Sequence, residues 1–533
     1  MPSAAPAPAL LKIPPGEAPS TSTLGRMMRG AFWLALKTPV SVILALWSVP
    51  LTQEYIGKSA NGAYLFAWGF SFLQFLLEFG MGSALQRQMV DAYARGDRDG
   101  VNRTIACGMN FYAAVSLIQM AALLAIAYGG LPAEFRSPMV LGLFWIQVLT
   151  TPFFGISTVV GGVLQAARRY DFIPRLELAI IVLRFGFLAL GYWTRAPFLA
   201  VVVAQLAVQI GLSLGPALWV MVKELGYVPH FGGATRSDYA AMLHVSIYMA
   251  MIQWSVVLAD KVDTVVLGYA LRGDDTGFLI TVYQNVSRPF LQLRQTGWTL
   301  AYLVMPAVVS LAVGGDRSSL ERIKYDGTRL LVGLLTPASL LAGIYAAPFL
   351  ALWVGREFVP HAWMLQLFLV AILPLSIVVL AQMALGMGQI KVIAWSSLAG
   401  ALVNLPLSFA LTRTLGVSGV IWGTVLTTLV SNLLVPGIYL FKLLEIRPGT
   451  FFARALGAPL AGALALVAAC WVCRLALPPG PAEGTALERT APFLANLAVG
   501  SLAYLTGYVA VPAGRGDLAA LGRKLRRRPA PGG

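Results

Sequence analysis

Apolar runs of about 20 residues follow one another along nearly the whole chain, from about Ala31 to Val511. A run of this length lets an α-helix cross the hydrocarbon core of a bilayer. Because 58% of the residues are hydrophobic and only 12% are charged, no stretch has the composition of a water-soluble domain. The sequence therefore predicts an all-α polytopic membrane protein, whose work is done inside the membrane or at its faces.

Hydropathy and the positions of glycine and proline predict about fourteen transmembrane helices. Their windows are 31–51, 62–84, 104–128, 139–165, 177–193, 197–222, 241–270, 280–311, 329–353, 362–386, 392–412, 418–441, 454–476 and 491–511. Of the 39 Lys and Arg residues, about 26 lie in the tails and in the loops after even-numbered spans, and about 8 lie in the opposite loops. This bias predicts a multi-pass membrane protein with both termini in the cytoplasm. The net charge of +16 is then mainly topological, which disfavours nucleic acid as a partner.

An internal repeat predicts two lobes. The sequence GDRDGVNR (96–103) returns as GDRSSLER (315–322), 219 residues later, which is close to six spans. An even number of spans gives both copies the same orientation, so two pseudo-symmetric six-helix lobes would enclose a central cavity. The predicted division is a disordered cytoplasmic tail at 1–25, an N-lobe of spans 1–6 at 26–225, a C-lobe of spans 7–12 at 238–443, two additional spans at 452–513 and a basic cytoplasmic tail at 514–533.

Neither cofactor nor catalytic chemistry is predicted. Cys470 and Cys473 form a C-x-x-C pair inside a span, without zinc-like partners or a redox-type context. The predicted outer loops are short, and only the connector at 478–488 is longer. They leave no room for a catalytic outer domain, so we do not expect an enzyme.

Charged residues inside the predicted spans are the main indication of function, because each is costly in contact with lipid and should face a protein interior or a hydrated cavity. Five are basic and three acidic: Lys37, Arg184, Lys261, Arg288, Arg294, Glu78, Asp260 and Asp263.

Span 8 carries a polar stripe at helical spacing. It consists of Gln284, Arg288, Gln292, Gln295 and Thr299. Arginine binds phosphate in a bidentate manner, and amides both donate to and accept from sugar hydroxyls, so the stripe fits an anionic, oxygen-rich ligand. Arg294 lies off the stripe but is a further candidate. Alternatively, the stripe joins the two lobes by hydrogen bonds, or the end of a long helix stands in water.

Spans 1 and 2 carry Lys37, Gln74 and Glu78, which we also predict to contact substrate. Their spacing allows a Lys37–Glu78 ion pair between neighbouring helices, and the functional alternative releases Lys37 to a ligand phosphate. Arg184 in span 5 would extend a basic path from the loop after span 4, or would reach back to the interface.

Asp260 and Asp263 in span 7 are one turn apart. Two carboxylates in a poorly solvated place tend to share a proton, so they are candidates for proton or cation coupling. Structural pairing, with Lys261 neutralising one of them, is the alternative.

Several segments resemble the polysaccharide-biosynthesis (O-antigen, Wzx-type) branch of the multidrug/oligosaccharidyl-lipid/polysaccharide (MOP) flippase superfamily. The matching segments, in order, are LLEFGMGSAL (76–85), GVLQAARRYDF (162–172), ADKVDTVVLGYAL (259–271), PAVVSL (306–311), LWVGREF (352–358) and LGVSGVIWGT (415–424). The fourteen predicted spans are more similar to the lipid II flippases or polymer exporters of the superfamily than to the usual twelve-span members. Phe278 stands where a Tyr is common.

The resemblance implies two six-helix bundles, alternating access, and transfer of an undecaprenyl-pyrophosphate-linked oligosaccharide from the inner to the outer leaflet of the bacterial inner membrane. The partners would be this polyprenyl-linked oligosaccharide and membrane lipids, and a complex with a polysaccharide polymerase is left open. A MATE-like cation or drug antiporter would instead require an acidic cavity, whereas basic residues outnumber the deep carboxylates five to three. An intramembrane transferase or polymerase acting on lipid-linked sugars is the alternative from another class.

Overall fold

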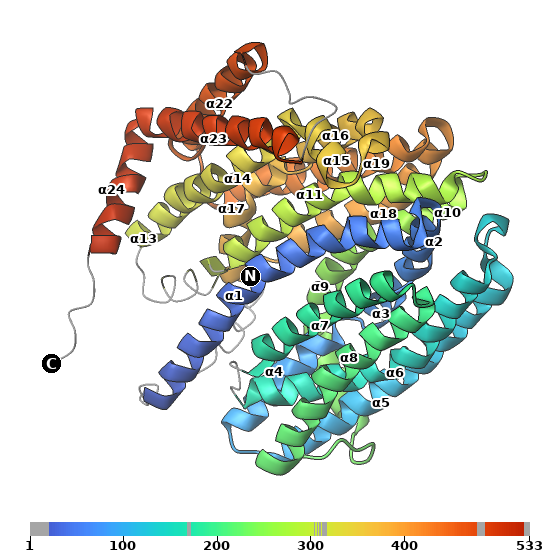
Figure 1. Ribbon diagram of the computed structural model, residues 1–533. Coiled ribbons are helices and arrows are strands. Elements are labelled where there is room, and N and C mark those ends of the chain that lie inside the picture. Colours follow the sequence, from blue (N-terminus) through green and yellow to red (C-terminus); the bar gives the residue numbers. More distant parts are fainter. Residues whose placement is uncertain are drawn as a thin grey trace. The chain divides into compact units, whose positions relative to one another are not determined.

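The computed structural model describes residues 21–167, 172–302, 304, 305, 308, 311, 317–476 and 486–526. Within these ranges the chain forms helices and no strands (Figure 1). The helices up to residue 224 are α1 (Thr21–Ile56), α2 (Lys58–Gly69), α3 (Phe72–Leu77), α4 (Met81–Ala94), α5 (Arg98–Ala125), η1 (Ile126–Gly130), η2 (Ala133–Phe135), α6 (Pro138–Ala166), α7 (Phe172–Thr194), α8 (Phe198–Trp219) and η3 (Val220–Glu224).

The helices of the second half follow in the same way. They are α9 (Arg236–Lys261), α10 (Asp263–Ala270), α11 (Thr276–Tyr302), α13 (Arg317–Arg322), η4 (Ile323–Gly327), α14 (Thr328–Ile344), α15 (Ala346–Trp353), η5 (Arg356–His361), α16 (Ala362–Val370), η6 (Leu373–Ser376), α17 (Val378–Gly386), α18 (Lys391–Leu415), α19 (Val417–Thr428), η7 (Leu429–Leu434), α20 (Val435–Leu443), α21 (Pro448–Phe451), η8 (Phe452–Leu456), α22 (Gly457–Ala476), α23 (Ala486–Ala510) and α24 (Pro512–Arg526).

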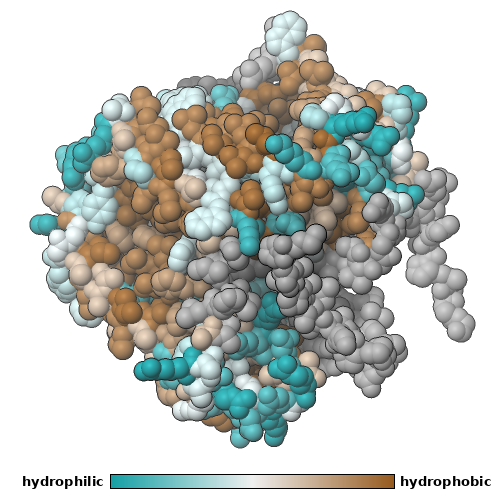
Figure 2. All heavy atoms as spheres, turned by 180° about the vertical axis from the view of Figure 1, so that it is seen from behind, coloured by the Kyte–Doolittle hydropathy of each residue, from teal (hydrophilic) through white to brown (hydrophobic). Residues whose placement is uncertain are grey.

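The predicted all-α polytopic membrane fold is confirmed. Within the described residues, each predicted window overlaps one helix or a broken run of helices, and most of the last part of window 280–311 lies outside those residues. In the described part of the chain, ten helices are long and apolar enough to cross a membrane, or up to eleven if the bent run 58–94 is one span. The helices of windows 31–51, 241–270 and 280–311 are not among them, so the predicted number of about fourteen spans is not confirmed. Hydrophobic side chains cover much of the face in Figure 2, with hydrophilic ones gathered in separate patches.

Span 2 is broken twice. Its first helix, α2, ends at Gly69, and α3 ends in a turn where Phe79 has φ 50° and Gly80 has φ 69°. Phe79 adopts the left-handed conformation although it carries a side chain, which costs about 1–2 kcal/mol. The two parts, 58–77 and 81–94, are bent by 47°. The break places Glu78 at a turn in the middle of the predicted span.

Two compact units make up the chain. The first comprises 1–48, 85–110 and 153–238, and the second comprises 49–84, 111–152 and 239–533. These boundaries differ from those of the predicted lobes at 26–225 and 238–443, which divide the chain by its internal repeat. The two lobes therefore stay a prediction.

The core of the first unit joins α4, α5 and α6. Met89, Ile105 and Val163 are fully buried there, and Leu85 and Val159 both pack against Gly108. These apolar side chains lie on the faces that the helices turn toward one another, as helical periodicity requires.

The core of the second unit contains stacked aromatic rings. Phe66 of α2 stacks on Phe135, with ring centroids 4.2 Å apart, and Phe290 of α11 stacks on Phe368 of α16 at 5.1 Å. Both pairs anchor helices that carry candidate site residues. The positions of α2 and α11 are therefore fixed by large buried side chains.

Parts of several predicted segments lie outside the described residues. These are residues 1–20 of the N-terminal tail, Arg168 and Arg169 of the turn after span 4, most of PAVVSL (306–311), and much of the connector at 478–488. Helix α1 already begins at Thr21, and α24 covers the first part of the predicted basic tail.

Candidate functional site

Helix α11 carries the predicted polar stripe on one uninterrupted helix, with Pro289 inside it. Arg288, Gln292, Gln295 and Thr299 are exposed, and these four residues are called the polar face of α11 below. Within the described residues, no hydrogen bond or ion pair reaches the Arg288 guanidinium. An arginine side chain with no such partner requires water or a polar ligand, because lipid cannot solvate it.

The first residue of the stripe, Gln284, is buried against α2. Gln284 is only 9% exposed, and its Oε1 accepts a hydrogen bond from Asn61 Nδ2 of α2 at 3.1 Å. Asn61 also donates to Thr281 Oγ1 at 3.1 Å. Hydrogen bonds thus join Gln284 to α2, while the predicted alternative, in which the stripe joins the two lobes, stays a prediction.

A second pair of amides extends this contact. Gln53 near the end of α1 donates through Nε2 to Asn285 Oδ1 at 2.7 Å, and both side chains are buried. We call the five residues together the amide seal: Gln53, Asn61, Thr281, Gln284 and Asn285. Sequence reasoning missed Gln53, Asn61 and Asn285. All three are uncharged polar residues close to span ends, within one helical turn of other polar residues. This pattern could have identified them.

Small residues bring α2 and α11 into backbone contact beside the amide seal. A Cβ atom added to Gly62 would lie 1.7 Å from the Gly277 carbonyl oxygen, and one added to Gly277 would lie 2.4 Å from the Ser59 carbonyl oxygen. No other residue fits either position without a shift of the helices. This is the close approach typical of membrane helices that meet at small residues.

The ion pair predicted between Lys37 and Glu78 is wrong. Lys37 Nζ of α1 instead donates to Glu177 Oε2 of α7 at 2.5 Å, with side chains 26% and 44% exposed. Glu177 lies near the start of span 5, so it was available to the same analysis. Sequence spacing could not choose between two acids on different helices.

Glu78 has two other partners. Its carboxylate accepts hydrogen bonds from Tyr112 Oη at 2.6 Å and from Gln253 Nε2 of α9 at 3.1 Å. The predicted neighbour Gln74 lies half-buried on α3, one turn before it. Glu78 thus joins the broken span 2 to α5 and α9.

Arg184 and Arg294 both contact protein groups. Arg184 Nη1 of α7 donates to Gln209 Oε1 of α8 at 2.8 Å, and Gln205 Nε2 donates to the Arg184 carbonyl oxygen at 2.9 Å. The Arg294 guanidinium lies over the Phe290 ring, 5.1 Å from its centroid. Their predicted roles in substrate binding remain predictions.

The two acids of span 7 lie on either side of a helix break. Helix α9 ends at Lys261 and α10 begins at Asp263, so Asp260 and Asp263 belong to different helices. Asp263 is 3% exposed and accepts hydrogen bonds from Tyr283 Oη and, at 3.4 Å, from Thr424 Oγ1. The side chain of Asp260 lies outside the described part of the structure. Coupling by this pair stays a prediction.

A cavity of about 590 Å³ lies between α14 and the run α16–η6. Of its four polar side chains, three are bonded to backbone, Thr336 to the Val332 carbonyl, Ser339 to that of Leu335 and Gln366 to that of Gly343, and the fourth is Ser376. The remaining lining is largely aliphatic. It therefore offers little to a charged headgroup, and the polar face of α11 is the better candidate site.

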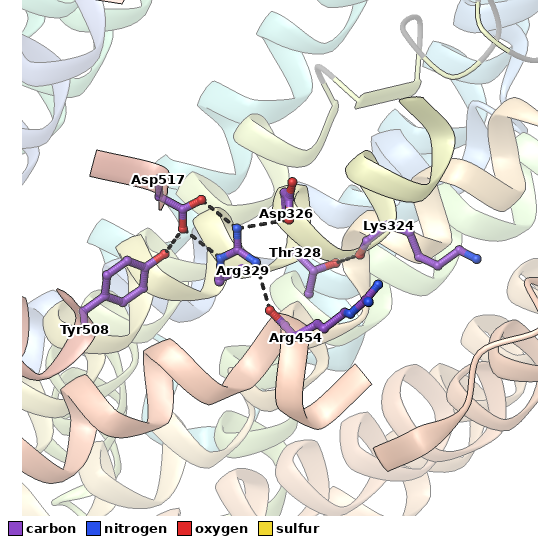
Figure 3. A network of polar contacts seen from close by, with 7 residues as sticks. All are labelled: Lys324, Asp326, Thr328, Arg329, Arg454, Tyr508 and Asp517. Atoms are coloured by element: carbon purple, nitrogen blue, oxygen red, sulfur yellow. Dashed lines mark hydrogen bonds and ion pairs between the residues drawn. The ribbon is translucent and has the colours of Figure 1, made fainter. Parts of the chain in front are cut away.

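Sequence reasoning also missed a buried ionic network that holds α24 (Figure 3). Arg329 of α14 donates through Nε and Nη2 to the two carboxylate oxygens of Asp517, at 2.8 and 2.7 Å. Tyr508 Oη donates to Asp517 at 2.7 Å, and Arg329 Nη1 donates to the Arg454 carbonyl oxygen at 3.0 Å. The sequence feature that could have identified this network is Asp517, a single acidic residue in the strongly basic segment 514–533.

No cluster of three metal-ligating side chains occurs in the part of the chain that was described. The polar face of α11 carries one positive charge and amide groups that can donate and accept hydrogen bonds.

Comparison with known proteins shows that this is a polytopic membrane protein with the fold of MOP-superfamily transporters. An inward-facing multidrug resistance MATE family transporter of that superfamily superposes with a TM-score of 0.62 at 14% identity, over 78% of this chain and 99% of the transporter. A structure of the lipid II flippase MurJ in an inward closed conformation gives a TM-score of 0.68 at 15% identity, over 89% of this chain and 98% of that one.

In sequence, the chain is similar to a Bacillus subtilis (strain 168) protein, the uncharacterized membrane protein EpsK. The two are 24% identical over 342 residues, which are 60% of this chain and 63% of the relative. The chain thus matches somewhat less than two thirds of that relative's length. No family model matches the sequence.

Proposed function

We propose that this protein is a flippase that moves a polyprenyl-pyrophosphate-linked oligosaccharide from the inner to the outer leaflet of the bacterial inner membrane by alternating access. Its fold, shared with a lipid II flippase and a MATE transporter, supports a transport function. The excess of basic residues in one set of loops supports cytoplasmic termini. No covalent step is required, so the protein would not be an enzyme.

The observation that carries the proposal is Arg288 on the polar face of α11, an exposed residue whose guanidinium makes no hydrogen bond or ion pair within the described residues. Moving a sugar-pyrophosphate through hydrocarbon strips its hydration, at a cost of about 2–7 kcal/mol for each uncompensated polar group. A guanidinium with two parallel donors replaces part of that hydration at the phosphate. Gln292 and Gln295, one and two turns further along, would replace it at sugar hydroxyls.

The remaining candidate residues would act in later steps. Lys37 would leave Glu177 and bind the ligand phosphate. Breaking the Lys37–Glu177 ion pair costs little, because both side chains are partly exposed. Arg184 would contribute positive potential, and protonation of Asp260 and Asp263 or the membrane potential would drive the change of state. Glu78 and Gln74, at the broken span 2, and Arg294 would complete the site.

The amide seal supports alternating access. It closes one end of the stripe and leaves the next residue, Arg288, exposed. A carrier needs such a barrier on one side of its binding site at a time. With cytoplasmic termini, the seal would lie on the outer side and would break when substrate is released.

The proposal is tested in a deletion strain complemented with the full-length chain. Arg288→Ala should abolish polymer export and cause lipid-linked oligosaccharide to accumulate on the inner leaflet, while Arg288→Lys should keep partial activity because the charge remains without the bidentate geometry. Arg413→Ala is the matched control, since Arg413 is an exposed arginine at the end of α18. Normal export by Arg288→Ala at wild-type protein level would refute the assignment.

Two alternative functions predict different results in two further assays. A cation or drug antiporter would raise resistance to cationic compounds in a pump-deficient host without affecting lipid-linked sugars. An intramembrane transferase would form a new glycosidic product when purified protein is mixed with lipid-linked substrate. The flippase predicts neither outcome.

A further inference from the structure

Helices α2 and α11 run in the same direction from the amide seal. The Thr281 hydroxyl donates to the Lys58 carbonyl oxygen at 2.7 Å, and Asn61, further along α2, reaches both Thr281 and Gln284 further along α11. One turn along either helix is about 5.4 Å. The residues one turn beyond the Asn61–Gln284 contact, Tyr64 on α2 and Arg288 on α11, therefore come next in the same helix pair.

Two observations support this placement. Tyr64 and Arg288 are close enough to interact electrostatically. Phe66 and Gly268 pack together on the other side of α2, where Phe66 is fully buried. Since residues two positions apart point in nearly opposite directions on a helix, Tyr64 is turned away from that core.

Trp68 continues the same face of α2. It lies one turn beyond Tyr64, and the two rings stack with centroids 6.0 Å apart and planes 28° from parallel. Both side chains are only half-buried. A pair of partly exposed aromatic rings thus lies on α2, with Tyr64 on the side of the exposed residue Arg288.

Each component of this group fits a different part of one ligand class. The flat C–H face of a sugar ring packs on an aromatic ring, through dispersion and weak C–H contacts to the π face. A guanidinium binds the phosphate attached to that sugar, and an amide binds its hydroxyls. A tryptophan used only for packing would not need a nearby cation that has no hydrogen bond or ion pair within the described residues.

We propose that Tyr64 and Trp68 form a sugar subsite beside the phosphate position of Arg288, which makes the protein selective for glycosylated diphosphates over bare ones. The inference rests on the proposed function and deepens it. Trp68 supplies the platform for the first sugar, and Tyr64 lies between that platform and Arg288.

The test measures binding to the purified full-length protein in lipid nanodiscs. The two probes are farnesyl diphosphate and the same diphosphate carrying one N-acetylglucosamine. Wild type should bind the glycosylated probe about tenfold more tightly, which corresponds to about 1.4 kcal/mol. Trp68→Leu should remove this preference while leaving the affinity for farnesyl diphosphate within about twofold.

Three variants keep the test interpretable. Trp68→Phe retains an aromatic face and should keep most of the preference, which a purely space-filling role would not require. Trp193→Leu, at a tryptophan that is 84% exposed on α7, should bind both probes as wild type does. Arg288→Ala should weaken both probes alike.

The sugar subsite is overturned if wild type binds the two probes equally, or if Trp68→Leu weakens both to the same extent. In either case the flippase proposal stands as long as Arg288→Ala still lowers the affinity for both probes. Binding of both probes that is unaffected by Arg288→Ala would reject the phosphate site of the proposed function as well as the subsite built on it.

Discussion

Arg329 and Asp517 are joined by two nearly parallel hydrogen bonds of 2.8 and 2.7 Å, although they lie 188 residues apart (Figure 3). Their side chains are 8% and 11% exposed. This bidentate pair ties α24, which follows the last span, to α14. A buried pair of this kind contributes to the position of a helix even where its net effect on stability is small.

Removing one partner of this pair should destabilise the protein strongly. We expect Asp517→Ala to lower the free energy of unfolding by about 3 kcal/mol, because it leaves a buried guanidinium without its counter-charge. Asp326→Ala is the control, since Asp326 also contacts Arg329, at 3.0 Å, but is 48% exposed; its cost should stay within about 1 kcal/mol. Thermal unfolding in detergent measures both. Equal effects of the two substitutions would contradict the buried role of Asp517.

Acid should weaken the same contact. Burial alone would raise the pKa of the Asp517 carboxyl, but hydrogen bonds from Arg329 and Tyr508 and the charge of Arg329 outweigh it and lower this pKa below the usual aspartate value. The contribution of Asp517 to stability is therefore fully present above about pH 4, the unfolded pKa, and is lost as pH falls through the lower folded pKa. The difference in melting temperature between wild type and Asp517→Asn should be constant from pH 7 to about pH 5 and should shrink below that range. A difference that grows on acidification would refute the assigned direction.

The sequence predicted the helices better than it predicted their partners. Hydropathy locates apolar helices because the bilayer imposes one length and one composition on every span. It also placed Arg288, Gln292 and Gln295 correctly on one exposed face, since helical spacing alone decides which residues share a stripe.

Contacts between distant segments could not be predicted in this way. Lys37 pairs with Glu177 rather than Glu78, and the choice depends on which helices are neighbours, which spacing within one helix does not reveal. For the same reason, the sequence did not predict the contacts Asn61–Gln284 and Arg329–Asp517, in which the two residues are 223 and 188 positions apart. For Gln284, helical spacing predicted the face of α11 on which it lies. Its burial depends on the contact with Asn61 of α2, which spacing could not predict.

The close approach of α2 and α11 should not tolerate a side chain. Gly62→Ala places its Cβ on the Gly277 carbonyl oxygen, so the helices must separate, at a cost of about 1–3 kcal/mol. Gly211→Ala in α8 is the matched control, because nothing lies within 4 Å of its added Cβ. That control should leave the protein unchanged or stabilise it by up to about 1 kcal/mol. The measurement is the thermal stability of both variants. If Gly62→Ala is as stable as wild type, α2 and α11 do not need this contact.

The amide seal should control access to the residues beyond it. Asn61→Leu keeps a similar volume but removes the donor to Thr281 and Gln284, which leaves the buried Gln284 oxygen unpaired at a cost of about 1–3 kcal/mol to the closed state. If the open state is relieved of this cost, its population should rise about tenfold for each 1.4 kcal/mol. The reporter is Ser287→Cys, a position that is 2% exposed next to the seal.

Labelling of this cysteine by a membrane-impermeant maleimide, in a background whose three native cysteines are replaced by serine or alanine, should be about tenfold faster with Asn61→Leu. Asn432→Leu serves as the matched control, because Asn432 accepts a hydrogen bond from Ser397 in a different part of the fold. It removes the same kind of side chain without touching α2 or α11, so its labelling rate should equal that of the unsubstituted reporter. If both leucine variants accelerate labelling equally, the change reflects general loosening of the helices, and the amides of Asn61 and Gln284 do not form the barrier.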